Sequence, residues 1–244
     1  MSARIRREQG GDTAMSSRGA QCDCEELYRQ LLDAMMNADR ARAAEIIDSA
    51  LSGGIPPARV ITDILDPAIV RLGAMWEGES ISLAQNFIAS KIAEDALLRC
   101  LPERKEPHGP KGVAVIGNIE DDFHSLGRRT VGLFLGTAGW QVVDLGNDVP
   151  AEQFLEKALE VKASVIGVSA MMQTTALNIK KLRDLIDREG QKDRIKLAVG
   201  GAVFNWRPEL VAEVGGDGTT RNAVGADHLF TRLQKLALAS GHVS

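Results

Sequence analysis

The residues best suited to chemistry lie in one short stretch, Asp122-Phe123-His124-Ser125-Leu126-Gly127. The imidazole of His124 can bind a metal or move a proton, and a carboxylate two residues earlier can reach its second nitrogen. A simpler interpretation is also open. Asp and Ser before a helix are ordinary caps, and a surface histidine beside them can be incidental. His124 is therefore a candidate centre whose meaning depends on the rest of the chain.

The elements around this stretch predict its place in the fold. The run Val113-Ala114-Val115-Ile116-Gly117 is short, rich in β-branched residues and bounded by glycine, so it predicts a buried strand. Helical spacing follows it, in Leu126, Thr130, Val131, Leu133 and Phe134. His124 would then lie in a strand-to-helix loop, and in open parallel sheets such loops form the ligand crevice.

Beyond residue 112 the pattern alternates between strands and helices, which predicts an α/β domain over 111–244. We expect a flavodoxin-like (Rossmann-like), five-stranded parallel sheet. Its strands are expected at 113–117, 141–145, 164–168, 195–199 and, more weakly, near 214–218; its helices are expected near 126–138, 151–161, 175–189, 207–213 and 222–239.

Two later loops carry further polar or small residues. Ser169-Ala170-Met171-Met172-Gln173-Thr174-Thr175 follows the third expected strand, and Gly200-Gly201 follows the fourth. If strands one and three are neighbours, Ser169 or Thr175 can hydrogen-bond to Asp122. Alternatively, Thr174 or Thr175 only caps the next helix. Paired glycines allow a ligand to approach the backbone, or they simply turn the chain.

The first half of the chain predicts helices only. Apolar stripes, glycines and prolines between 22 and 101 indicate a four-helix bundle with short connections, in which Pro67 predicts a kink or an early break. Residues 1–21 read as a disordered tail without a signal sequence, and the charged, proline-rich segment 102–110 reads as an interdomain linker.

Composition narrows the classes of function. The formal charge is −4 with mixed signs and aromatic residues make up 4%, so neither a nucleic-acid surface nor base stacking is predicted. No apolar run approaches the roughly 20 residues that span a bilayer, which favours a cytoplasmic protein. Three cysteines and four histidines show no familiar metal-site spacing. A metal at His124 would therefore take its other ligands from a cofactor.

Together, the Asp122-x-His124-x-x-Gly127 loop, the Ser169-to-Thr175 loop and Gly200-Gly201, behind a helical domain, resemble the cobalamin-binding module. The chain is similar to the corrinoid proteins of methanol, methylamine and methoxyl-group methyltransferases and to cobalamin-dependent methionine synthase. The phrase 143–150, Val-Asp-Leu-Gly-Asn-Asp-Val-Pro, also reads like that family. The chain departs from it at Asp121, where methyl carriers commonly have glycine, and at Met171 and Gln173, where leucine and threonine are common.

The resemblance implies roles for residues that match its motifs. His124 would be the lower axial ligand of cobalt, oriented by Asp122, which Thr175 or Ser169 would support. The helical domain would cap the cofactor. Cofactor contacts are implied for the first-loop residues Asp122, Phe123, His124, Ser125, Leu126 and Gly127, for the later loops at Ser169, Met171, Thr174, Thr175, Gly200 and Gly201, and for Trp76 and Phe87 of the cap.

The function implied is a methyl carrier, with methylcobalamin favoured over adenosylcobalamin and with methyltransferase proteins as partners. The chain contains no barrel-like pattern for either half-reaction, so we expect it not to catalyse turnover alone. A homodimer is possible. The alternatives are a cobalamin-dependent regulator or light sensor that acts through protein contacts, an adenosylcobalamin mutase subunit, and a binding module without cobalamin. Against the sensor, the expected Glu-His pair after Trp76 is replaced by Asn86-Phe87.

Overall fold

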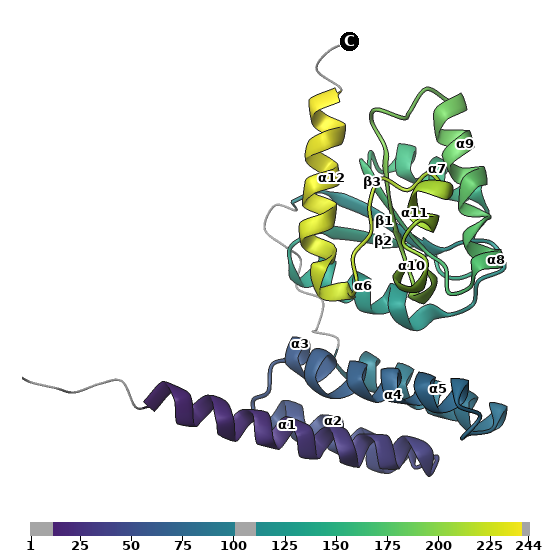
Figure 1. Cartoon of the computed structure of the whole chain (residues 1–244). Helices are drawn as coiled ribbons and strands as arrows, with labels where there is room; N and C mark the ends of the chain where they lie inside the picture. The colour runs from purple at the N-terminus through teal and green to yellow at the C-terminus, as the bar shows by residue number, and fades with distance from the viewer. Residues whose placement is uncertain (1–11, 101–110, 241–244) are drawn as a thin grey trace, which may run out of the picture. The chain divides into compact units, whose positions relative to one another are not determined.

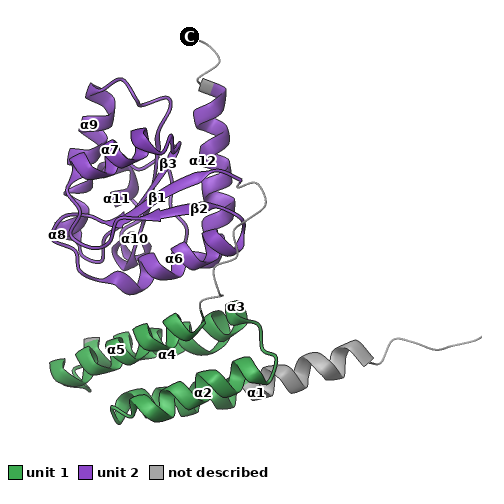
Figure 2. Ribbon diagram, turned by 180° about the vertical axis from the view of Figure 1, so that it is seen from behind, with its two compact units in different colours: residues 1–102 green, residues 103–244 purple. Residues whose placement is uncertain are grey.

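The computed structural model describes residues 12–100 and 111–240, with side chains from Cys24 onward except those of Glu77 and Ser240. The chain forms two compact units that divide after Pro102 (Figure 2). Helix α1 begins at Asp12, inside the stretch predicted to be a disordered tail, and residues 1–11 lie outside the described part. The predicted linker, 102–110, also lies outside it.

In the described residues of the first unit, 12–100, the regular elements are helices. In chain order they are α1 (Asp12–Met36), α2 (Arg40–Ser52), α3 (Pro57–Arg59), the π-helix η1 (Val60–Leu65), α4 (Asp66–Glu77) and α5 (Leu83–Arg99). Pro67 lies in the first turn of α4, directly after the π-helical turn η1, and this turn is the interruption expected near Pro67. The core of this unit is aliphatic: Leu31, Met35, Ile46, Ile47, Ile61, Ile64, Leu65, Ile92 and Leu97.

The second unit is an α/β domain with a parallel sheet (Figure 1). Its strands are β1 (Val113–Asn118), β2 (Gln141–Asp144), β3 (Val165–Ser169) and β4 (Lys196–Gly200), in the order β2-β1-β3-β4. Its helices are α6 (Ser125–Thr137), α7 (Ala151–Glu160), α8 (Gln173–Ala176), α9 (Ile179–Arg188), α10 (Ala202–Trp206), α11 (Leu210–Glu213), the 3₁₀ turn η2 (Ala223–Gly225) and α12 (Ala226–Ser240).

The prediction of a fifth strand near 214–218 is wrong for the described residues, which contain four strands. This segment makes one bridge, between Ala198 and Gly218, and the backbone N–H of Asp217 donates to Leu197. Its sequence, Val-Gly-Gly-Asp-Gly, explains the difference, because glycine and aspartate disfavour strands and Gly215 has a left-handed φ of 74°.

Two helical boundaries also differ from expectation. The single helix expected over 175–189 is divided into α8 and α9, and the one expected over 207–213 is replaced by α10 and α11. Pro208 lies between α10 and α11, where its missing N–H prevents one continuous helix. Both divisions lie in segments that follow strands, β3 and β4.

Helices cover both faces of the sheet. On one face α6 and α12 bury Ile116, Leu135, Trp140, Phe230 and Leu233, and Trp140 meets Phe230 edge-on with centroids 5.8 Å apart. On the other face α7 and α9 bury a larger apolar cluster that includes Val115, Phe154, Ile166, Ile179 and Leu182. This sandwich fixes the strands whose ends hold the site.

Close packing in the second cluster gives the first prediction. A Cβ at Gly117 would lie 2.6 Å from the Phe154 ring, so Gly117→Ala overpacks the core and we expect a loss of about 1–3 kcal/mol in the free energy of unfolding. Gly136 in α6 is the matched control: its Cβ would meet no atom within 4 Å, and Gly136→Ala is expected to be neutral or stabilising by up to about 1 kcal/mol. Urea unfolding followed by circular dichroism measures both. Equal stabilities for the two variants would contradict this packing.

Candidate functional site

The predicted site loops begin at one edge of the sheet. In the parallel register, Asn118 at the end of β1 pairs with Ser169 at the end of β3, and Ser169 pairs with Gly200 at the end of β4. The three loops that follow these residues therefore leave the sheet side by side (Figure 1). This is the carboxyl edge, where ligands bind to open parallel sheets.

The side chain of Asp122 is buried completely and accepts hydrogen bonds from two of these loops. Its Oδ1 accepts from Asn118 Nδ2 at 2.7 Å and from the backbone N–H of His124 at 2.9 Å. Its Oδ2 accepts from the backbone N–H of Met171 at 2.7 Å and from Thr175 Oγ1 at 3.1 Å. The carboxylate therefore fastens the loop after β3 to the loop after β1.

These donors also set the ionisation of Asp122. Burial disfavours the charged form, but the N–H groups of Met171, His124 and Asn118 together outweigh it, so the pKa of Asp122 lies below its ordinary value. A carboxylate held in this way is an anion at neutral pH. It is therefore a fixed hydrogen-bond acceptor for the imidazole beside it.

His124 is the N-cap residue of α6 and presents its imidazole at the surface. Its Nδ1 lies 3.4 Å from Asp122 Oδ1, and 52% of the side chain is exposed. The structure thus brings together the two residues whose spacing suggested chemistry. Since Nδ1 faces the buried carboxylate, the other ring nitrogen is left for a ligand.

The hydroxyl that reaches Asp122 is that of Thr175, not Ser169. Thr175 is buried within α8, and its Oγ1 lies 3.1 Å from Asp122 Oδ2 and 3.0 Å from the carbonyl of Met172, so its hydrogen has two acceptors. Ser169 contributes its backbone instead, because its carbonyl accepts from the N–H of Ile119. Thr174 is exposed on the same short helix.

Two polar residues of the site were not singled out from the sequence. Asn118 is fully buried and donates to Asp122 and to the carbonyl of His124, the latter at 3.2 Å. Arg128 is buried in the first turn of α6 and its Nε donates to Asn118 Oδ1 at 2.7 Å. The sequence held one signal for Arg128. The dipole of a helix disfavours a cation in its first turn, so an arginine at this position indicates a specific partner.

The loop after β2 is hydrogen-bonded to the His124 loop through the side chain and the backbone of Asp148. Asp121 and Asp148 both have left-handed φ angles, 70° and 55°. The N–H of Asp121 donates to Asp148 Oδ1 at 2.8 Å, and the N–H of Asp148 donates to the carbonyl of Asp122 at 3.1 Å. Through these two hydrogen bonds the segment 143–150 holds the His124 loop in place, a role that its sequence did not predict.

The surface around His124 offers space and apolar contacts. Gly201 has a φ of 120°, and a Cβ there would lie 1.9 Å from the carbonyl oxygen of Ala170, so only glycine fits. Beside Gly127 and Gly200 a Cβ would meet no atom within 4 Å. Exposed apolar side chains also belong to these loops, those of Phe123, Met171 and Met172. An imidazole donor, open glycine backbone and apolar side chains fit a broad ring ligand with a metal at its centre.

The remaining predicted contacts of the first loop differ in exposure. Ser125, the first residue of α6, is buried, and Leu126 is half-buried.

Within the ranges 12–100 and 111–240, no group of three or more His, Cys, Asp or Glu residues has an arrangement that holds a metal ion. In the same part of the chain, no helix has the length and apolar character needed to cross a membrane.

Trp76 and Phe87 belong to the helical unit, on α4 and α5. Their side chains are 42% and 62% exposed, and the ammonium of Lys91 lies 5.9 Å from the centroid of the Phe87 ring. Both rings are therefore accessible from outside the helical unit. Their contact with a cofactor stays a prediction.

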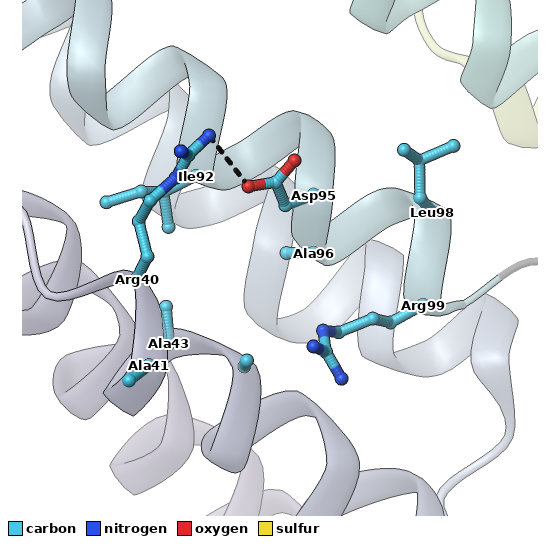
Figure 3. A pocket seen from close by; sticks show the side chains of 9 residues that line it. Arg40, Ala41, Ala43, Ile92, Asp95, Ala96, Leu98 and Arg99 are labelled. Atoms are coloured by element: carbon cyan, nitrogen blue, oxygen red, sulfur yellow. Dashed lines mark ion pairs between the residues drawn. The ribbon is translucent and has the colours of Figure 1, made fainter.

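A pocket of about 570 Å³ lies elsewhere in the helical unit, between α2 and α5 (Figure 3). Arg40 and Asp95 form an ion pair across it, with 3.0 Å between Nη2 and Oδ2, and alanines line much of its floor. It contains none of the predicted site residues. The sheet edge around His124 is therefore the candidate functional site.

Known proteins are similar to this chain over both of its units. Models described as B12 binding domains match residues 112–226 and 27–100. Trimethylamine corrinoid protein 1 of Methanosarcina acetivorans is 35% identical over 201 residues, which cover 80% of this chain and 93% of that protein. The dimethylamine corrinoid protein of Methanosarcina barkeri is 32% identical over 210 residues, covering 84% and 98%.

The solved structure of the Methanosarcina barkeri monomethylamine corrinoid protein superposes with a TM-score of 0.79 at 31% identity, covering 86% of this chain and 99% of that one. The likeness in sequence and the likeness in structure each cover at least 80% of the chain. The chain therefore belongs to the family of cobalamin-binding corrinoid proteins.

Proposed function

We propose that this chain binds cobalamin with His124 as the lower axial ligand of cobalt, in place of the cofactor's own benzimidazole base, and carries a methyl group between partner methyltransferases. One observation supports this above the others: a half-exposed imidazole at the carboxyl edge of the sheet is backed by a fully buried carboxylate. The relatives support the carrier role, since they are named as corrinoid proteins of methylamines.

Bound cobalamin supplies a cobalt centre that can accept and release a methyl group. His124 would hold this centre from below through its free ring nitrogen. Gly200 and Gly201, with Ser169 beside them, would line the path of the displaced nucleotide tail, because a Cβ at Gly200 would meet no atom within 4 Å and this side of the loop is open. Methylcobalamin is the form that a carrier requires, so we favour it over adenosylcobalamin.

Asp122 orients the imidazole and offers a place for a proton. Its Oδ1 lies 3.4 Å from His124 Nδ1, so a proton can be held between these two atoms. A proton taken up by this pair would weaken the hold of His124 on cobalt, and its loss would strengthen that hold. Thr175 and the N–H of Met171 keep the far oxygen of the carboxylate in place throughout.

We propose the helical unit as a four-helix cap for the upper face of the cofactor. Trp76 and Phe87 would exclude water and oxygen from it with their exposed rings. A shielded face must open before another protein can reach it, so the cap would move during transfer. Partner methyltransferases would load and remove the methyl group, and the chain itself would be the carrier.

Replacing His124 tests the ligand assignment. The full chain is reconstituted in the dark with methylcobalamin, and the visible spectrum is recorded for wild type, His124→Ala and His228→Ala. We expect a base-off, histidine-ligated spectrum for wild type and for His228→Ala, whose histidine lies on α12. His124→Ala is expected to lose the nitrogen-ligated bands and to bind about tenfold or more weakly, as metal sites do when a ligand is lost.

Two outcomes would contradict the proposal. Identical spectra for wild type and His124→Ala would remove His124 as the ligand. Selective uptake of adenosylcobalamin, with a light-dependent change in assembly on gel filtration, would favour the sensor instead of the carrier.

Replacing Asp122 tests the buried acceptor. Asparagine turns one acceptor into a donor that faces other donors, so Asp122→Asn is expected to lower the free energy of unfolding by about 1–3 kcal/mol at neutral pH. The pKa of Asp122 is depressed in the folded chain. Its stabilisation is therefore complete above the unfolded-chain pKa, about 4, and is lost as the pH falls through the lower folded pKa.

Urea unfolding between pH 7 and pH 3 measures this dependence. The difference between wild type and Asp122→Asn should be constant at neutral pH and shrink below about pH 4. Asp193→Asn is the control, because Asp193 is exposed on the loop before β4 and its loss should leave the profile unchanged. If the difference in the free energy of unfolding between wild type and Asp122→Asn grows as the pH falls, folding does not lower the pKa of Asp122 and the account is wrong.

A further inference from the structure

Arg128 has an unusual environment for a cation. It lies in the first turn of α6, one turn beyond His124, and only 5% of its side chain is exposed. A buried guanidinium is tolerated only when its donors are paired, and the helix dipole disfavours a cation at this end. Its position therefore requires compensating partners.

Each side of the guanidinium has one. Its Nε donates to Asn118 Oδ1 at 2.7 Å, its Nη1 forms an ion pair with Asp144, and its Nη2 donates to Asn147 Oδ1 at 3.0 Å. Asp144 ends β2 and Asn147 lies in the loop after it, whereas Asn118 ends β1. Arg128 thus joins the loop after β2 to the strand that carries the His124 loop.

The contact with Asn118 fixes the direction of an amide. Because a guanidinium only donates, it holds the amide oxygen, and the NH₂ group must point the other way. That group donates to Asp122 Oδ1 at 2.7 Å and to the carbonyl of His124 at 3.2 Å. A cation at the amide oxygen polarises the amide and strengthens donation from its nitrogen.

We infer that Arg128 is a positioning residue for His124: through Asn118 it holds the Asp122 carboxylate and the His124 backbone in place, and through Asp144 and Asn147 it ties this loop to the loop after β2. This inference rests on the proposed function in one respect, that His124 ligates cobalt. The geometry it describes belongs to the protein without cofactor.

The test separates these two parts. Amide hydrogen exchange of the cofactor-free, ¹⁵N-labelled chain is measured by NMR at the N–H groups of His124 and Met171, which both donate to Asp122. Arg128→Met keeps an unbranched apolar stem but removes the guanidinium and its donors. We expect exchange at His124 to speed up about tenfold, because the amide of Asn118 is then free to turn.

Arg183→Met is the matched control. Arg183 in α9 is also largely buried, with its Nη1 3.3 Å from Asp217 Oδ2, but it belongs to the other end of the sheet near β4. Its loss should leave exchange at His124 unchanged. Arg128→Lys, which keeps the charge but cannot reach three acceptors, provides a milder variant if Arg128→Met does not fold.

The second readout concerns the ligand. In the cob(II)alamin-loaded chain, nitrogen hyperfine splitting of the EPR signal reports the histidine-ligated fraction. We expect this ligation to weaken about tenfold in Arg128→Met and less in Arg128→Lys. If Arg128 acts through Asn118, Asn118→Leu should have a similar effect and the double variant no more than the larger single one.

The outcomes are distinguishable. Unchanged exchange and unchanged nitrogen splitting in a folded Arg128 variant would overturn the inference. If exchange changes as expected but wild type itself shows no splitting that depends on His124, the positioning role of Arg128 holds for the loop and the proposed function fails.

Discussion

The site depends on one buried carboxylate. The buried Asp122 accepts four hydrogen bonds: from Asn118 at the end of β1, from His124 on its own loop, and from Met171 and Thr175 in the segment after β3. A buried anion without these donors would cost several kcal/mol. Separating the two loops would therefore leave Oδ2 of this carboxylate without its donors, and the same carboxylate also lies beside the imidazole of His124.

The sheet makes this arrangement possible. The order β2-β1-β3 sets the loops after β2 and β3 on either side of the loop after β1. Arg128 and Asp148 fasten it from one side, and Thr175 fastens it from the other. Glycine at 201 lets the next loop pass close to Ala170. The polar residues of the site are thus held by hydrogen bonds, while its apolar side chains Phe123, Met171 and Met172 are exposed.

Local patterns predicted the elements that carry the site more reliably than the contacts within it. Short apolar runs between helical patterns predicted β1 to β4, and the spacing of Asp122 and His124 predicted that their side chains meet. Both predictions depend on residues that are close in the sequence. Whether Thr175 or Ser169 reaches Asp122 depends on where α8 begins. The roles of Asn118 and Arg128 depend on hydrogen bonds between residues that are 10 to 19 positions apart in the sequence. The weak fifth strand failed because one apolar residue cannot offset three glycines in 214–218.

The most direct test of the account is a crystal structure of the chain reconstituted with cobalamin, with anomalous diffraction data collected at the cobalt absorption edge. The account predicts a cobalt peak at bonding distance from the outer ring nitrogen of His124, with Nδ1 still facing Asp122 and the benzimidazole displaced from the metal. A cobalt peak away from His124, or a benzimidazole nitrogen still bound to it, would contradict the central claim.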